Sequence, residues 1–162
     1  ATGASATLLR PTLVYGAGRD QTLARIAAMA RRMGFFVLPR GAEGRRQPVH
    51  VDDLAAAALA VVDAPATHGQ VYALPGGEAL AYREMVVRTL AALDPPATLW
   101  QLPMPVFRAV LSFARMAGAM RGLSDDAVAR MREDLVFDAT PARNDFGYAP
   151  RAFIVDRRAL GA

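Results

Sequence analysis

Short apolar runs alternate along the chain with longer segments in which apolar residues recur every three to four positions. The short runs lie between proline or glycine breaks and predict strands; they are 7–15, 35–39, 45–51, 70–74 and 97–103. The periodic segments predict helices; they are 20–33, 53–63, 82–93, 106–120, a segment that begins at 124, and 140–147. Strands that alternate with helices are typical of the α/β fold class.

Polar residues and glycines mark several of these helix ends. Asp20, Asp52 and Thr140 stand where a side-chain oxygen caps the first turn of a helix. Gly34 and Gly147 stand where a helix ends in the left-handed conformation that glycine favours. Capping accounts for Asp52 without a catalytic role.

Two of the predicted helices carry a distinct apolar stripe. In helix 53–63 the spacing predicts a buried face, which comprises Leu54, Ala57, Ala58, Val61 and Val62. In helix 106–120 the corresponding stripe comprises Val106, Val110, Phe113, Ala117 and Met120. We interpret this second stripe as core. The alternative is a membrane or partner surface, because Arg108, Arg115 and Arg121 punctuate it.

Composition narrows the classes of function. The formal net charge is +4, and all 19 basic residues are arginines, spread along the chain without a basic run. Because aromatic residues are not interleaved with them, we expect no nucleic-acid partner. The chain has no cysteine, which excludes disulfides and thiolate chemistry and favours a cytoplasmic location. His50 and His68 lack neighbouring clusters of carboxylates, so no metal site is predicted, and His50 is interpreted as a structural residue.

The stretch "LVYGAGRDQ" has the outline of a phosphate-binding loop, a strand that enters a glycine turn and a helix. The dinucleotide fingerprint needs three small residues. Gly16 and Gly18 supply two of them, but Gln21 occupies the third position. No acidic residue ends a second strand about 20 residues further on. The stretch is therefore interpreted as a strand-to-helix turn and not as a phosphate loop.

Four blocks in order carry a resemblance to a known family: "LLRPTLVYGAGRD", "RRQPVHVDDLAAA", "GQVYALPGGEALAYREMV" and "DFGYAPR". Together they resemble the C-terminal half of an extended or atypical short-chain dehydrogenase/reductase of the NAD(P)-dependent epimerase/dehydratase family. The resemblance implies the C-terminal part of a Rossmann-like doubly wound sheet plus a small α/β substrate-binding subdomain. Residues 1–162 would form a single partial domain, with a late Rossmann strand 7–16, helix 20–33 and a substrate-side subdomain at about 35–155. The N-terminal cofactor-binding half would be absent.

The same resemblance implies site residues. The strand that contains "RPTLVYG" would line the nicotinamide end of the cleft, with Pro11 and Thr12 at the cofactor and Leu13 and Tyr15 at the substrate. Arg46 stands where the family often places an arginine that reaches substrate phosphates, which suits the fork of donors on a guanidinium. Leu13 departs from the asparagine common among members of the family that act on nucleotide sugars, and this favours an apolar substrate or no substrate.

The family's glycine-rich loop and its catalytic Tyr-x-x-x-Lys pair are not present. The chain has no lysine, so no tyrosine can have a lysine four residues after it. The tyrosines are Tyr15, Tyr72, Tyr82 and Tyr148. We therefore assign no catalytic residue, and we expect the implied NAD or NADP not to bind this chain alone.

Two hypotheses follow. The chain is the substrate-side half of such an oxidoreductase, inactive alone, with a missing N-terminal half or partner chain that supplies the catalytic groups. Alternatively, it is a non-catalytic scaffold, a homo-oligomer or a subunit of a larger complex, with helix 106–120 as a contact to a membrane surface.

Overall fold

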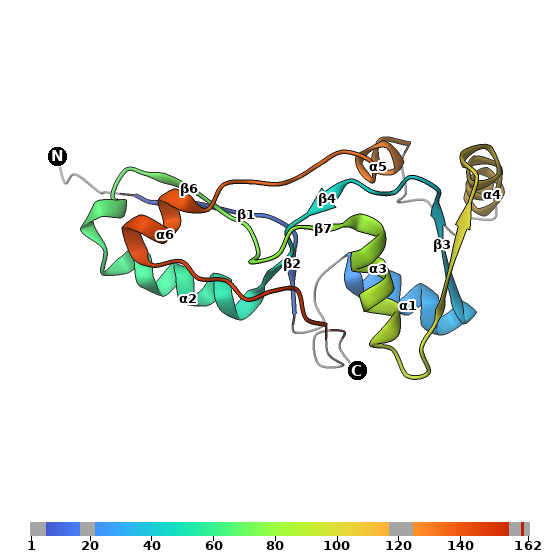
Figure 1. Ribbon diagram of the computed structural model, residues 1–162, viewed down its shortest axis with the longest axis horizontal. Coiled ribbons are helices and arrows are strands. Elements are labelled where there is room, and N and C mark those ends of the chain that lie inside the picture. The colour runs from blue at the N-terminus through green and yellow to red at the C-terminus, as the bar shows by residue number, and fades with distance from the viewer. Residues whose placement is uncertain (1–5, 17–21, 117–124, 156–159, 161–162) are drawn as a thin grey trace. The chain divides into compact units, whose positions relative to one another are not determined.

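The structure is a computed structural model that describes residues 6–16, 22–116, 125–155 and 160 (Figure 1). The chain divides into two compact units, each built from separated segments. Unit 1 comprises residues up to Asp20, Arg46–Ala79 and residues from Leu135, and unit 2 comprises Gln21–Arg45 and Leu80–Asp134. The predicted helix 20–33 therefore falls almost wholly in unit 2. Segments 46–79 and 135–155 fall in unit 1, together with the opening strand.

Unit 1 contains two parallel strand pairs. β1 (Leu8–Pro11) pairs with β6 (Val71–Leu74), and β2 (Val14–Tyr15) pairs with β5 (Val49–His50). Thr12 and Leu13 lie between β1 and β2, so the predicted strand 7–15 is broken in two. The break lies where the chain changes its partner: the Thr12 N–H donates to the Leu74 carbonyl at 3.3 Å, and the Leu13 carbonyl accepts from the Val49 N–H at 2.9 Å.

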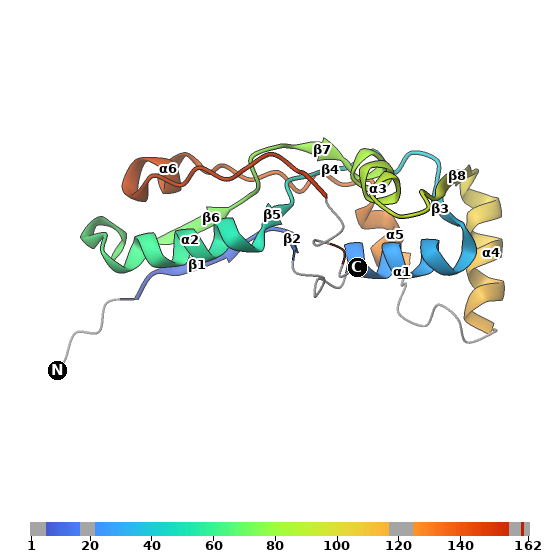
Figure 2. The same ribbon diagram turned by 90° about the horizontal axis from the view of Figure 1, so that it is seen from below.

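Helices cover one face of the β1–β6 pair. These are α2 (Val51–Val62) and α6 (Thr140–Phe146), and a short 3-10 turn, η1 (Pro65–Thr67), follows α2. Figure 2 shows α2 beside β1 and β6. The core here consists of apolar and aromatic side chains from β5, α2, β6, α6 and the segments next to α6; they are Val49, Ala57, Tyr72, Leu74, Ala139, Ala142 and Tyr148.

Unit 2 is built around a third parallel pair, β3 (Phe35–Pro39) with β8 (Thr98–Leu102). α1 (Leu23–Met33) and α3 (Tyr82–Ala91) pack on each other and on this pair. α4 (Met104–Met116) packs on β3, and α5 (Asp125–Arg130) adds Val128 to the cluster of Phe107 and Leu111. The remaining short strands are β4 (Arg45–Arg46) and β7 (Leu80–Ala81), which pair with each other. The parallel pairs of both units confirm the predicted α/β, Rossmann-like class.

Two of the predicted helix caps are wrong. α2 begins at Val51, and the Asp52 N–H donates to Nδ1 of His50 at 3.2 Å, so His50 is the cap. α6 includes Thr140, whose N–H donates to Oδ1 of Asp138 at 2.8 Å. The proposed cap Asp20 lies outside the described residues, as do Gly18 and Gln21. The helix ends at Gly34 and Gly147 are confirmed, with φ of 76° and 71°.

The predicted buried stripes are wrong in part. On α2 only Ala57 of the predicted face is buried, and Val62 is 72% exposed. On α4 the buried residues are Phe107 and Leu111, whereas Phe113 of the predicted stripe is 70% exposed. Ala117 and Met120 lie outside the described residues. In both helices apolar residues occupy more than one side, so spacing alone did not identify the side that packs. No helix in the described ranges is long and apolar enough to cross a membrane.

Candidate functional site

A hollow of about 170 Å³ lies within unit 1. It is lined by residues from three segments that are distant in sequence; they are Thr12, Leu13, Arg46, Gln47, Leu135 and Phe137. Ligand pockets usually measure roughly 300–1,000 Å³. The hollow is therefore large enough for part of a small molecule.

The break between β1 and β2 places two residues in the hollow. The Thr12 hydroxyl donates to the Gln47 carbonyl, and this bond joins the break to the residue after β4. The same carbonyl accepts from the Gly76 N–H at 3.0 Å. A Cβ on Gly76 would lie 1.8 Å from the carbonyl oxygen of Pro48, so only glycine allows this approach. Leu13 adds an apolar side chain to the lining.

Arg46 brings the only charge to this lining. Its side chain is buried, with 6% exposed, whereas the neighbouring Arg45 is exposed. The backbone of Arg46 forms a parallel bridge with Leu135. A guanidinium in partly apolar surroundings binds carboxylate or phosphate more strongly than it would in water, because the local dielectric is lower. Arg46 is therefore the residue of this lining whose charge suits an anionic group.

Three residues of the hollow were missed by the sequence reasoning: Gln47, Leu135 and Phe137. The Gln47 side chain accepts from the Phe137 N–H at 2.7 Å, across 90 positions of sequence, and so holds segment 135–137 against the hollow. The position of Gln47 next to Arg46 was the one usable signal. Nothing in the local pattern of residues 135–137 indicated a site.

The predicted cofactor and substrate residues are brought together only in part. Thr12, Leu13 and Arg46 line the hollow, but Pro11 and Tyr15 do not. Pro11 is exposed and lies opposite Leu74 at the end of β1. Tyr15 is 1% exposed, and its hydroxyl accepts from the Ile154 N–H at 3.3 Å. Its ring packs edge-on against His50 and Phe153, with centroids 5.1 and 5.0 Å apart.

Two further tyrosines are held in structural roles. The Tyr72 hydroxyl donates to Oδ2 of Asp145 at 2.5 Å, and this bond, with burial, raises the pKa of Tyr72 to about 12. The Tyr148 hydroxyl donates to the Pro75 carbonyl at 2.8 Å, and burial, with the nearby Asp53 charge, raises the pKa of Tyr148 to about 12. A catalytic acid or base works best with a pKa near the working pH. Neither hydroxyl meets that condition.

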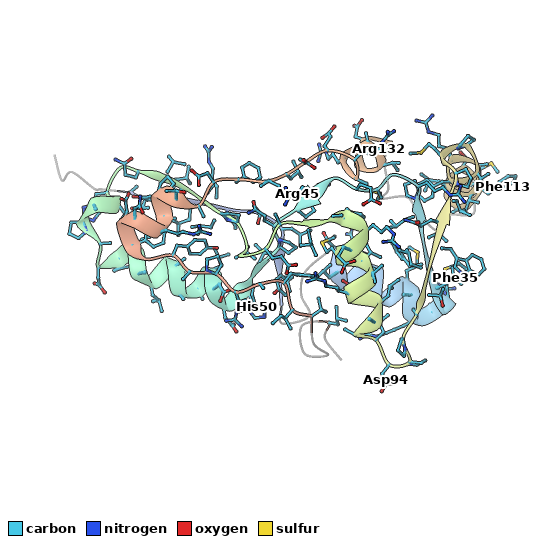
Figure 3. The ribbon with its side chains drawn as sticks, in the orientation of Figure 1. Phe35, Arg45, His50, Asp94, Phe113 and Arg132 are labelled. Atoms are coloured by element: carbon cyan, nitrogen blue, oxygen red, sulfur yellow. The ribbon has the colours of Figure 1, made fainter. Side chains whose placement is uncertain are left out.

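Charged groups at the start of α2 are also structural. Asp53 accepts from the Arg151 guanidinium at 2.8 Å and from the Arg151 N–H at 3.0 Å. His50, labelled in Figure 3 at the start of α2, caps the helix as expected of a structural histidine. No group of three or more metal-ligating side chains occurs in the part of the chain that the structure describes.

The fold defines a class: an α/β protein with parallel strands and a hollow at the break between β1 and β2. Residues 1–74 match the model of the NAD dependent epimerase/dehydratase family, which confirms the family resemblance found in the sequence. The match includes the break at Thr12–Leu13 and the Arg46–Gln47 segment. It ends before residues 135–137.

A curated relative is similar over most of the chain, and two solved structures share its fold. The 2-alkyl-3-oxoalkanoate reductase of Stenotrophomonas maltophilia is 29% identical over 156 residues, which cover 90% of this chain and 47% of that protein. The terminal R domain of the myxalamid biosynthetic pathway shares the fold with a TM-score of 0.69 at 21% identity, over 98% of this chain and 43% of that one. Epimerase Mth375 of Methanothermobacter thermautotrophicus has a TM-score of 0.66 at 16% identity, over 96% of this chain and 41% of that one. The chain spans about half the length of the curated relatives it matches.

Proposed function

We propose that this chain is the substrate-side part of an NAD(P)-dependent oxidoreductase of the epimerase/dehydratase type. In this proposal a further segment or a partner chain supplies the glycine-rich cofactor loop and the tyrosine–lysine pair. The chemistry is hydride transfer between a nicotinamide and a carbonyl or alcohol carbon. The residues of this chain bind and orient the substrate.

The observation that carries the proposal is the open sheet of unit 1. Tyr72 and Leu74 point to the covered face of the β1–β6 pair, whereas Leu8 and Val71, partners in register, are 50% and 53% exposed on the other face. Parallel sheets are normally covered on both faces and contain more than two strands. The exposed face is what a chain would present if further parallel strands and helices of a nucleotide-binding half completed the sheet.

The outer surface of α2 supports the same conclusion. Leu59 and Val62 are each 72% exposed, although α2 is rich in alanine and valine. Burial of one such side chain contributes about 1.5–3 kcal/mol. The raised pKa values of Tyr72 and Tyr148 add a chemical argument, since neither hydroxyl is suited to proton transfer near neutral pH. The reactive hydroxyl is therefore assigned to the completing half.

The lining of the hollow favours an apolar substrate with one anionic group. Leu13, Leu135 and Phe137 offer apolar contacts, and Arg46 offers a bidentate donor. Leucine at position 13 cannot hydrogen-bond the hydroxyl groups of a sugar. A 3-oxo acid with alkyl chains, the substrate class in the name of the Stenotrophomonas reductase, combines these properties.

The test is a chimera that joins the N-terminal part of that reductase to residue 1 of this chain. We expect NADPH-dependent reduction of an alkyl-substituted 3-oxo acid, followed as loss of absorbance at about 340 nm. Arg46→Met removes the anion-binding fork at similar length, and should raise KM by about tenfold to a hundredfold with little change in kcat. Arg45→Leu is the matched control, because Arg45 is exposed and outside the hollow; it should leave KM unchanged.

Two outcomes would count against the proposal. A folded chimera that binds NADPH but reduces no 3-oxo acid, nucleotide sugar or simple ketone would favour the scaffold alternative. Equal effects of Arg46→Met and Arg45→Leu on KM would exclude the hollow as the substrate site. Leu13→Asn separates substrate classes: it should lower activity on the apolar acid if Leu13 contacts the alkyl chain.

A further inference from the structure

The outer side of α4 is an apolar stripe that the described residues of unit 2 leave about half or more exposed. Phe107 and Leu111 on the inner side pack with Val128 from α5 and with Val37, Leu102 and Met104. The outer residues are spaced as on one helical face; Val106, Val110, Phe113 and Met116 are 47%, 46%, 70% and 76% exposed. A free apolar stripe of this size is uncommon on a surface that faces only water.

A stacked aromatic pair lies on the neighbouring sheet, on the face against which α4 packs. Trp100 on β8 is the register partner of Val37 on β3, so both side chains project to the face of the sheet on which α4 packs. Phe35 lies two residues before Val37, on the same face, and stacks on Trp100 with ring centroids 4.5 Å apart and planes 12° apart. Trp100 is 52% exposed. Figure 3 labels Phe113 on α4 and Phe35 on β3.

α4 itself carries arginines and no acidic residue, whereas α5, which packs on it through Val128, begins with Asp125 and Asp126. Residues 95–124, which include β8 and α4, contain Arg108, Arg115 and Arg121 and no aspartate or glutamate. Ser112 is the one other polar residue of α4. Its hydroxyl donates to the Arg108 carbonyl at 2.9 Å, so this donor is already hydrogen-bonded within the helix. A helix with an apolar side, arginines and no acid suits the interface of an anionic bilayer. Tryptophan is the residue most typical of that interface.

We propose that α4 and the Phe35–Trp100 pair form a docking surface for an anionic lipid membrane. α4 lies in the plane of the interface, with Val110 and Phe113 among the acyl chains and Arg108 at the lipid phosphates. At 13 residues the helix lies on the bilayer and does not cross it. The inference concerns unit 2 and is independent of the substrate hollow in unit 1.

The test is co-sedimentation of the 162-residue chain with vesicles of phosphatidylcholine, alone or mixed with phosphatidylglycerol. We expect binding to the anionic vesicles that weakens at high salt, because screening shortens the reach of the arginine charge. Trp100 is the only tryptophan, so its fluorescence should shift to the blue on binding and be quenched by brominated lipid. Phe113→Ala should lower the partition coefficient about tenfold, and Arg108→Gln about fivefold.

Leu59→Ala on α2 is the matched control, since Leu59 is as exposed as Phe113 but lies in unit 1. It should leave the partition coefficient unchanged. An equal loss for Leu59→Ala and Phe113→Ala would overturn the proposal, because binding would then be unspecific adhesion of exposed apolar surface. Bound protein without a shift of Trp100 would also overturn it. So would a dimer that Phe113→Ala converts to monomer with no vesicle binding, which would assign the surface to a second copy.

Discussion

Gly76 offers a sharp test of how the hollow is held together. A Cβ at this position would lie 1.8 Å from the Pro48 carbonyl oxygen and 2.6 Å from its carbonyl carbon. Real Cβ contacts with backbone atoms do not fall below 3.0 Å. The atoms that must move belong to backbone, so Gly76→Ala has to push segment 47–49 away by more than an ångström.

The expected cost follows from the bonds that this segment makes. Displacement would break the Gly76 N–H bond to the Gln47 carbonyl and loosen the Thr12 hydroxyl bond to the same oxygen, at about 1 kcal/mol each. Overpacking adds about 1–3 kcal/mol. Gly76→Ala should therefore lower the free energy of unfolding by about 3–5 kcal/mol, a large part of the stability of a domain of this size.

Urea denaturation followed by far-UV circular dichroism measures this change. Gly69→Ala is the control in the same unit: its φ is +76°, and an added Cβ would meet nothing within 4 Å. It should cost only about 1–2 kcal/mol, from the left-handed backbone. If Gly76→Ala cost no more than Gly69→Ala, the packing of Gly76 against Pro48 would be refuted.

Three further predictions concern charged and titratable groups. Asp53→Asn should cost about 1 kcal/mol, since Arg151 is 47% exposed and solvent screens the pair; a loss unchanged in 1 M NaCl would contradict this. The pKa values of Tyr72 and Tyr148 are raised from the ordinary 10 to about 12, so the contribution of these two hydroxyls to the free energy of unfolding is full below pH 10 and is lost as the pH rises through 12. An absorbance titration in which both tyrosines ionise near pH 10 would refute this prediction. Hydrogen bonds from Thr140 hold the pKa of Asp138 below its ordinary value, so its contribution to stability is present above that ordinary value and is lost as the pH falls through the lowered pKa; Asp138→Ala should lower the urea midpoint at pH 7 and leave it unchanged in strong acid.

Much of the fold could be predicted from periodicity and breaks. β3 at Phe35–Pro39 and the helix end at Gly34 are where the sequence indicated, because proline and glycine fix those boundaries locally. α3 at Tyr82–Ala91 lies within the helix predicted over 82–93. Periodicity predicted an α/β fold, and the family resemblance added that the fold is Rossmann-like.

The wrong predictions share a physical cause. In each, two nearby residues suit the same role, and contacts with distant parts of the chain decide which of them takes it. On α4, Phe107 and Phe113 are both large and apolar, and only the partner surface of Val37 and Leu102 selects Phe107. The cap of α2 was assigned to Asp52, whereas the chain geometry after β5 presents His50 instead.

The hollow shows the same limit. Thr12, Leu13 and Arg46 were found because they lie in blocks that resemble the family. Phe137 lies 90 residues from Gln47, and only the fold brings its N–H to the glutamine side chain. A site closed by such a long-range bond leaves no spacing signal in the sequence.

The central claim is that this chain forms one wall of a nicotinamide site that another half completes. Isothermal titration of NADPH tests it most directly, first into the 162-residue chain and then into the chimera with the N-terminal part of the reductase. We predict no saturable heat with the chain alone and one site of micromolar affinity in the chimera. Micromolar binding by the chain alone would contradict the account.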